Sequence, residues 1–282
     1  MEIKVAGQAG YCYGVERALR MTDEAAEKRR KPIFTLGPII HNPQVVESFV
    51  ERGVKPVEDV DEVDTGTIIV RTHGVDPLVI ENAHTKGLAV VDATCPFVAK
   101  AQQRAAELVR DGYNLIIIGE PEHPEVAGIL AHARGKAVVV EKVEDARRVR
   151  GHKLGVVVQT TQALENFQQI VGVLAARASE LKVFNTICNA TTKRQEAAKK
   201  LAEEADVMIV VGGKNSANTS RLVQICRATG TVTHHIETAR ELDPAWLAQV
   251  KVVGLTAGAS TPQWLLREVI AKLKETAVEV GP

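Results

Sequence analysis

The sequence is poor in aromatic residues and has no excess of charge of either sign. Of its 282 residues, 4% are Phe, Trp or Tyr, and 35 Lys and Arg balance 35 Asp and Glu. A chain without a basic field has no electrostatic means of holding nucleic acid or an anionic membrane surface. The N-terminal sequence MEIKVAGQAG lacks the apolar segment of a signal peptide, and no run approaches the length of a transmembrane helix. We therefore expect a cytoplasmic protein with neither nucleic-acid nor membrane partners.

The cysteines lack the close pairing found in zinc ribbons and zinc fingers. Cys12, Cys95 and Cys188 are far apart in the sequence, and none of them belongs to a CxxC motif. In a reducing compartment, such cysteines bind metals or take part in catalysis more often than they form disulfides. A site shared by all three therefore has to be assembled by the fold.

A single unit is repeated three times along the chain. Each copy starts with an apolar run that ends at one of these cysteines, continues with a helical stretch, and then has a buried-strand pattern closed by a glycine. The runs are EIKVAGQAGYC, GLAVVDATC and ELKVFNTIC, and the glycines are Gly37, Gly119 and Gly212. Short strands that alternate with helices indicate parallel α/β structure. We predict three pseudo-repeated α/β domains, residues 1–95, 96–188 and 189–282.

Polar residues follow the predicted strands at the same steps of each copy. His41, His123 and Ser216 stand four positions after the closing glycines. The later strands TIIV, LGVVV and VKVVGL end in the polar segments 71–73, 159–161 and 256–260. Ligands of parallel sheets bind beyond the carboxyl ends of the strands. If the three copies pack with these ends facing inward, the cysteines and the polar residues meet in one central cavity.

Three cysteines at one step of a repeat suggest metal ligands. A lone cysteine is more often a small buried side chain, and this is our interpretation of Cys226, which has no equivalent in the other copies. Three thiolates can hold a [4Fe–4S] cluster and leave its fourth iron open, or hold a [3Fe–4S] cluster. An open metal position can bind substrate, as in catalytic zinc sites with three protein ligands. Such a cluster can act as both Lewis acid and reductant.

The polar residues at the strand ends form a candidate anion site. Its members are His41, His73, His123, Thr160, Ser216, Asn218 and Ser260. Several stand just before helices, where backbone N–H groups and the helix dipole favour phosphate. Polar loops at strand ends are, however, also common in α/β proteins without such a site. No dinucleotide fingerprint is present, and the GGKNS segment departs from a P-loop because Met208 occupies the position of its first glycine.

Glu125 is the carboxylate that we place inside this anion site. Burial beside an anion would raise its pKa and leave it able to deliver protons. The alternative is a solvated glutamate at a helix start, stabilised by the helix dipole. The other histidines fall outside the repeated positions. We expect surface or structural roles for His84, His132, His152, His234 and His235.

In its motifs, the sequence resembles the 4-hydroxy-3-methylbut-2-enyl diphosphate reductase family. The matching segments are GYCYGVERA, HNPQVV, RTHGV, DATCPFVAK, HPEVAG, QTT, TICNATTKRQ, GGKNSANTSRL and GLTAGASTP. They run in family order from residue 10 to residue 262 and include every polar position of the candidate site.

The resemblance implies a trefoil of three α/β domains around a central iron–sulfur cluster, held by Cys12, Cys95 and Cys188. It implies that the substrate hydroxyl binds the open iron and leaves as water after two electrons and two protons are transferred. The products would be isopentenyl and dimethylallyl diphosphates, formed in the last step of the methylerythritol phosphate route. The electrons are expected from a reduced ferredoxin or flavodoxin.

The family motifs also imply a role for each polar residue. The residues expected to hold the diphosphate are His41, His73, His123, Ser216, Asn218 and Ser260. Thr160 is expected to orient the hydroxyl end, and Glu125 to supply the proton. One position departs from the family, because Ala217 stands where many members have Ser or Gly, so one hydroxyl donor to the diphosphate is missing.

Two functions from other classes remain open on the sequence alone. One is a non-catalytic α/β protein that binds a phosphorylated metabolite and leaves its cysteines unligated. The other is a zinc hydrolase with three cysteine ligands and a water. Iron and acid-labile sulfide, measured on anaerobically purified protein, distinguish all three functions.

Overall fold

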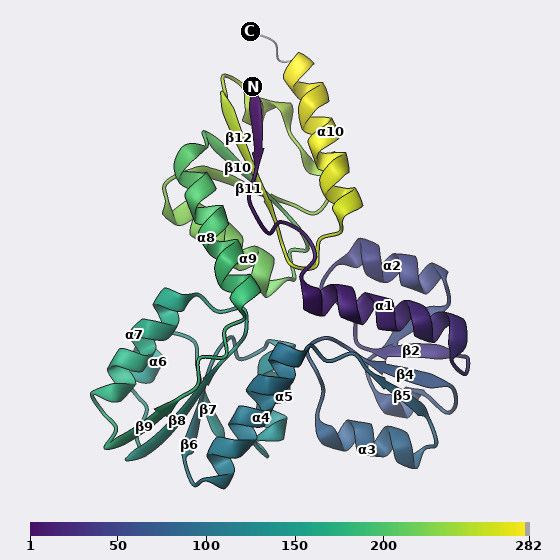
Figure 1. The fold of residues 1–282 in the computed structure, drawn as a ribbon, viewed down its shortest axis with the longest axis vertical. Coiled ribbons are helices and arrows are strands. Elements are labelled where there is room, and N and C mark those ends of the chain that lie inside the picture. Colours follow the sequence, from purple (N-terminus) through teal and green to yellow (C-terminus); the bar gives the residue numbers. More distant parts are fainter. Residues whose placement is uncertain (280–282) are drawn as a thin grey trace. The chain divides into compact units, whose positions relative to one another are not determined.

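The chain is built from parallel α/β structure. A computed structural model describes residues 1–279 and places their strands in three parallel sheets of four strands each (Figure 1). These residues form two compact units. The first unit contains Met1–Tyr13, His41–Val45 and the chain from Asn189 onward, and the second contains Gly14–Ile40 and Val46–Cys188. The predicted α/β class with three repeated sheets is confirmed.

The second unit contains two of the sheets, with strand orders β3-β2-β4-β5 and β7-β6-β8-β9. The strands of the former are β2 (Ile33–Leu36), β3 (Val54–Val57), β4 (Thr67–Val70) and β5 (Ala89–Asp92). Those of the latter are β6 (Asn114–Ile118), β7 (Ala137–Val140), β8 (Lys153–Val158) and β9 (Glu180–Val183). The helix before these strands is α1 (Tyr13–Lys28). The helices between them are α2 (Pro43–Glu51), the 3-10 helix η1 (Val60–Glu62), α3 (Pro77–Thr85), α4 (Pro96–Arg110), α5 (Pro124–His132), α6 (Val143–Ala146) and α7 (Leu164–Ala175).

The first unit contains the third sheet, with strand order β1-β12-β10-β11. Its strands are β1 (Glu2–Val5), β10 (Val207–Val211), β11 (Val232–Ile236) and β12 (Val252–Ala257). Its helices are α8 (Asn189–Glu204), α9 (Ala217–Ala228), α10 (Gln263–Glu279) and the 3-10 helices η2 (Ala239–Glu241) and η3 (Pro244–Leu247). Within residues 1–279, no helix is both long and apolar enough to cross a membrane.

Each sheet carries at one edge the strand that precedes a cysteine. β5 pairs with β4, β9 pairs with β8, and β1 pairs with β12, in every case in parallel. The strand before Cys12 therefore joins the sheet of β10, β11 and β12, although it opens the chain. The domain limits 1–95, 96–188 and 189–282 stay a prediction. In the structure, β1 lies in the predicted domain 1–95 but pairs with β12, which lies in the predicted domain 189–282.

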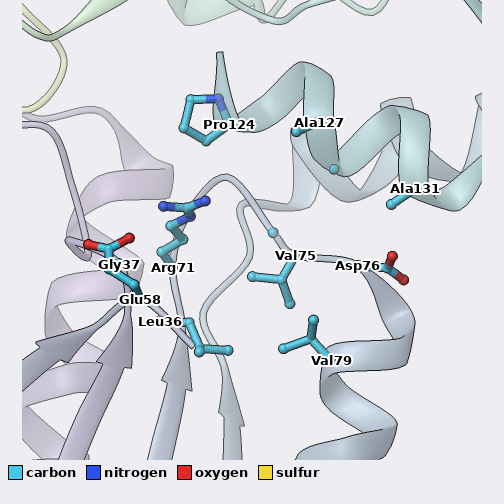
Figure 2. A pocket seen from close by; sticks show the side chains of 12 residues that line it. Leu36, Gly37, Glu58, Arg71, Val75, Asp76, Val79, Pro124, Ala127 and Ala131 are labelled. Atoms are coloured by element: carbon cyan, nitrogen blue, oxygen red, sulfur yellow. The ribbon is translucent and has the colours of Figure 1, made fainter. Parts of the chain in front are cut away.

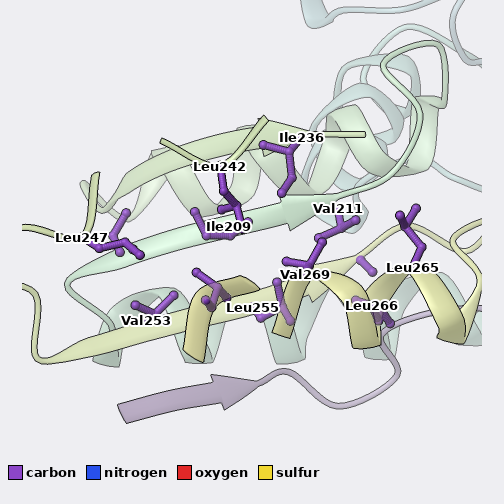
Figure 3. Packing of buried hydrophobic residues seen from close by; sticks show 13 residues of the cluster. Ile209, Val211, Ile236, Leu242, Leu247, Val253, Leu255, Leu265, Leu266 and Val269 are labelled. Carbon is purple, nitrogen blue, oxygen red and sulfur yellow. The ribbon is translucent and has the colours of Figure 1, made fainter. Parts of the chain in front are cut away.

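The middle strand of the third sheet is a continuous apolar run because both of its faces are covered. Val207, Ile209 and Val211 of β10 pack in the cluster that includes α10, which Figure 3 shows from close by. Met208 and Val210 pack instead with residues of α8 and α9. All five side chains are at most 2% exposed. Parallel sheets covered on both faces favour such runs, and burial of each aliphatic side chain stabilises the fold by about 1.5–3 kcal/mol.

Candidate functional site

The three predicted cysteine ligands occupy equivalent positions in the fold. Each follows an edge strand and stands directly before a helix, α1 after Cys12, α4 after Cys95 and α8 after Cys188. The backbone N–H of each cysteine donates to a carbonyl in the loop after the neighbouring strand. These bonds join Cys12 to Ala259 at 3.2 Å, Cys95 to Thr72 at 3.0 Å and Cys188 to Thr160 at 3.1 Å. The threefold repeat is therefore present in the hydrogen bonding as well as in the sequence.

The three predicted cysteine ligands have reduced thiol groups. All four cysteines lie in the described part of the chain and none forms a disulfide, and Cys12, Cys95 and Cys188 are half-buried. The partial positive charge at a helix N-terminus stabilises a thiolate, and soft thiolate donors suit iron–sulfur clusters and zinc. A set of three such donors, one per repeat, fits a cluster held at three of its irons.

Cys226 has a different environment. It is buried inside α9, and its Sγ lies 3.9 Å from the carbonyl oxygen of Ala198. Burial raises the pKa of the Cys226 thiol to about 11. A thiol that stays protonated inside a helical core is a packing group, which agrees with the structural interpretation of this residue.

Arg194 of α8 fixes the loop that leads to Cys12. Its side chain is 2% exposed, and its Nε and Nη2 donate to the carbonyls of Gln8 and Gly10, both at 2.8 Å. Gln8 and Gly10 have left-handed backbones, with φ of 64° and 99°, so the chain leaves the geometry of β1 there. A buried guanidinium needs acceptors for its donors. Arg194 therefore ties the Cys12 loop to the helix that begins after Cys188.

Glu125 and Thr160 form a buried hydrogen-bonded pair in the second unit. The backbone N–H of Thr160 donates to Oε1 of Glu125 at 2.7 Å, and its hydroxyl donates to Oε2 at 2.8 Å. Glu125 is 1% exposed. Burial raises the pKa of Glu125 to about 7, although the two hydrogen bonds from Thr160 act to lower it. These features favour a buried, protonatable Glu125 over the solvated alternative.

His123 stands before α5 and is oriented by the backbone of Glu125. Its Nδ1 accepts a hydrogen bond from the N–H of Glu125 at 3.1 Å, which caps the helix. In a neutral ring this assigns the proton to Nε2, which can then donate to a ligand. The ring of His73 lies edge-on to that of His123, with centroids 5.4 Å apart. Two predicted anion ligands of the second unit therefore lie side by side.

Gln102 of α4 supports the loop that carries His73. Its side chain is 3% exposed, and its Nε2 donates to the carbonyl of His73 at 3.4 Å. A Cβ at Gly74 would lie 2.4 Å from this Nε2, and one at Gly128 of α5 would lie 2.9 Å from it. The amide of Gln102 therefore fills the space beside both glycines, and a Cβ at Gly128 would also lie 3.2 Å from the carbonyl oxygen of His73. Gln102 was missed in the sequence, where its signal is a polar residue on the apolar face of a helix.

The first unit places its predicted anion ligands at the start of α9 and in the loop after β12. Ser216 caps α9 by accepting a hydrogen bond from the N–H of Thr219 at 3.4 Å. The hydroxyl of Ser260 donates to the carbonyl of His41 at 3.0 Å. Asn218 is 6% exposed, and neither atom of its amide group has a hydrogen-bond partner among the described residues. A buried amide is costly until a ligand or water supplies partners, so Asn218 indicates a polar ligand here.

Glycines leave space beside these polar groups. A Cβ at Gly213 would lie 2.7 Å from the carbonyl oxygen of His41, and one at Gly258 would lie 2.1 Å from Oγ1 of Thr219. The hydroxyls of Thr219 and Thr256 are also buried without a partner in the described chain. Sequence reasoning missed both threonines, because a single threonine near a strand end carries no distinctive signal.

The predicted site residues are divided between the two units. The first unit contains Cys12, His41, Ser216, Asn218 and Ser260, and the second contains Cys95, Cys188, His73, His123, Glu125 and Thr160. Hydrogen bonds and ring contacts bring several of them together within each unit. The meeting of both sets in one cavity stays a prediction.

Most of the other histidines make local contacts that fit structural roles. His132 bonds through Nδ1 to the carbonyl of Gly128 at 2.8 Å, and His235 bonds through Nε2 to that of Gly212 at 2.9 Å. His234 stacks on Trp246 with ring centroids 3.8 Å apart.

The protein has three repeated parallel sheets, and each sheet has a cysteine at the same strand-to-helix junction. These features define a narrow class of α/β proteins. Residues 3–274 match the model of the family described as LytB protein. The chain belongs to this family, and the resemblance seen in its motifs is confirmed.

Relatives and solved structures of the same enzyme cover nearly the whole chain. It is 50% identical over 278 residues to the 4-hydroxy-3-methylbut-2-enyl diphosphate reductase of Geotalea daltonii, covering 98% of each chain. The reductase of Geobacter sulfurreducens is 50% identical over 276 residues, with the same coverage. A solved (E)-4-hydroxy-3-methyl-but-2-enyl diphosphate reductase is 45% identical with a TM-score of 0.71, covering 97% of this chain and 99% of that one. The corresponding Plasmodium falciparum structure is 30% identical with a TM-score of 0.91, covering 100% of this chain and 88% of that one.

Proposed function

We propose that the protein is a 4-hydroxy-3-methylbut-2-enyl diphosphate reductase. It breaks the carbon–oxygen bond of the substrate's allylic alcohol and uses two electrons and two protons. One proton goes to the departing oxygen, which leaves as water, and the other goes to the allylic carbon. The products are isopentenyl and dimethylallyl diphosphates. The observation that carries this function is the repeated cysteine junction, with the same amide hydrogen bond at Cys12, Cys95 and Cys188.

These three cysteines are the proposed ligands of a [4Fe–4S] cluster. A cluster with three cysteine ligands supplies electrons and, at its open iron, a Lewis acid for oxygen. Each of these cysteines stands directly before a helix, and the N-terminal end of a helix favours anionic groups. Arg194 stabilises the conformation of the Cys12 loop without a cluster, because it donates to the backbone carbonyls of Gln8 and Gly10.

Glu125 and Thr160 are proposed to move the proton to the substrate oxygen. A carboxyl group with a pKa of about 7 is protonated in about half of the molecules at neutral pH. When protonated, it can donate to Oγ1 of Thr160, 2.8 Å away, and the Thr160 hydroxyl can then donate onward. The pair thus forms a relay that holds the proton inside the protein. General acid catalysis of this kind works best when the pKa lies near the working pH.

Six polar residues are proposed to bind the diphosphate. The residues assigned to it are His41, His73, His123, Ser216, Asn218 and Ser260. Asn218 gains partners for its buried amide, and His123 offers Nε2–H. The N-termini of α5 and α9 add backbone dipoles that favour anions. Because the sequence lacks a dinucleotide fingerprint, we assign electron supply to a reduced ferredoxin or flavodoxin. The protein is proposed to act in the cytoplasm.

Anaerobic purification followed by metal analysis tests this function. We expect stoichiometric iron and acid-labile sulfide, and oxidation of a reduced viologen dye that depends on the substrate. Cys95→Ser should lose activity and cluster, whereas the matched variant Cys226→Ser should keep both. Zinc in place of iron would support the hydrolase, and the absence of both metals would support the binding protein.

A further inference from the structure

A cavity of about 340 Å³ lies inside the second unit, lined by residues that have no role in the proposed reaction (Figure 2). It is bounded by the end of β2, the loop after β4, the start of α3 and one side of α5. Cavities of this size bind small metabolites. The two segments that face each other across it, the loop 71–76 and α5, carry His73 and Glu125.

Arg71 provides the only cationic side chain among the described lining residues. Its Nε is buried without a hydrogen-bond partner, and no hydrogen bond or ion pair to its guanidinium is found in residues 1–279. Burial lowers the pKa of Arg71, partly offset by the negative charge of Glu58. A Cβ at Gly37 would lie 2.3 Å from Nη1, so the guanidinium lies directly beside this glycine, whose φ of 66° also favours glycine. The buried Nε–H therefore lacks an acceptor in the described chain, and a ligand in the cavity can supply one.

The other lining residues determine which type of ligand the cavity can bind. Figure 2 shows Val75 and Val79 opposite Ala127 and Ala131, which form apolar walls. Two carboxylates, Glu58 and Asp76, also border the cavity, so its charged groups sum to one positive and two negative charges. The net negative lining repels phosphate and diphosphate, which carry more than one negative charge, more strongly than a carboxylate, whose single charge is placed on Arg71. A planar carboxylate matches the donor fork of arginine.

We propose that this cavity binds a small aliphatic monocarboxylate, with its carboxylate on Arg71 and its alkyl body between Val75, Val79 and Ala131. The bound molecule contacts both the His73 loop and α5. It therefore acts as an effector that fixes the relative position of two segments of the proposed catalytic site. The binding itself does not depend on the iron–sulfur cluster or on the proposed reaction.

Calorimetric titration of the purified holoprotein with 4-methylpentanoate tests the site, with the neutral 4-methylpentanamide as matched ligand. We expect millimolar binding of the acid and no measurable binding of the amide. Arg71→Gln should weaken binding by about tenfold to a hundredfold, as expected for loss of a hydrogen bond to a charged group. Ala131→Leu, which fills the cavity, should abolish binding, whereas the surface variant Arg110→Gln should bind as the wild type does. Hydrogen exchange should slow in residues 71–79 and 124–131.

Three results would overturn the assignment. The first is no binding of the acid up to about 50 mM, well beyond the millimolar range. The second is equal binding by the amide or by Arg71→Gln. The third is tighter binding of inorganic phosphate than of the carboxylate, because it would contradict the charge balance of the lining.

Discussion

Replacing Glu125 by Gln isolates the contribution that ionisation of this buried carboxyl group makes to the unfolding free energy. The variant keeps the shape and both contacts with Thr160, since an amide oxygen can accept from the backbone N–H and an amide nitrogen can donate to the hydroxyl. It cannot ionise. Any difference in pH dependence between wild type and variant therefore reports the ionisation of Glu125.

The magnitude follows from the pKa of Glu125, which rises from 4.5 to about 7 on burial. Because the folded state binds this proton more tightly than the unfolded state, the stabilising contribution is fully present below about pH 4.5. It is lost as the pH rises through about 7. At about 1.36 kcal/mol per pKa unit, the full loss is about 3 kcal/mol. Between pH 5.5 and pH 8, the wild type should lose about 2 kcal/mol of unfolding free energy relative to Glu125→Gln.

Urea unfolding of the metal-free proteins at these two pH values measures the difference. Glu122→Gln is the matched control, because Glu122 lies three residues before Glu125, in the loop that leads to α5, and is exposed. It should show the pH dependence of the wild type. In the loaded enzyme, Glu125→Gln should lower kcat by about 10²–10⁴-fold if the proton relay is lost. The reasoning is refuted if wild type and Glu125→Gln lose the same free energy, or if Glu122→Gln behaves as Glu125→Gln does.

Three further variants test packing, the cysteine loop and the diphosphate contacts. Arg194→Met should cost about 2–4 kcal/mol of unfolding free energy, because two backbone carbonyls lose a charged donor. It should also speed hydrogen exchange in residues 7–12, and unchanged exchange there would contradict the role of Arg194. Leu273→Ala, on the buried face of α10, should cost about 2–5 kcal/mol in urea unfolding, whereas Lys274→Ala at the exposed neighbouring position should change stability little. Ala217→Ser should lower KM by up to about tenfold with kcat unchanged, because an added donor binds ground and transition states equally; a rise in KM would mean that the new hydroxyl crowds the loop.

The sequence predicted the repeated unit and its chemistry because these depend on local order. A strand, a cysteine and a helix follow one another within a few residues, so this order can be recognised in the sequence without knowledge of the fold. The burial of Glu125 was also predictable, since it stands at a repeated step beside a histidine. The residues that support the site, such as Arg194 and Gln102, were not predictable. Arg194 binds carbonyls more than 180 residues away in the sequence, and no local pattern contains such a pairing.

The polar residues four positions after the three glycines differ in their local hydrogen bonding. Counting four residues from each glycine places His41 level with His123 and Ser216, and the latter two do cap helices. In the first copy the cap is Asn42, whose Oδ1 accepts a hydrogen bond from the N–H of Val45 at 3.0 Å. A helix start is fixed by its capping hydrogen bond and not by distance from the preceding strand. Asn42, and not His41, therefore caps α2. The ring of His123, in contrast, uses Nδ1 to cap α5.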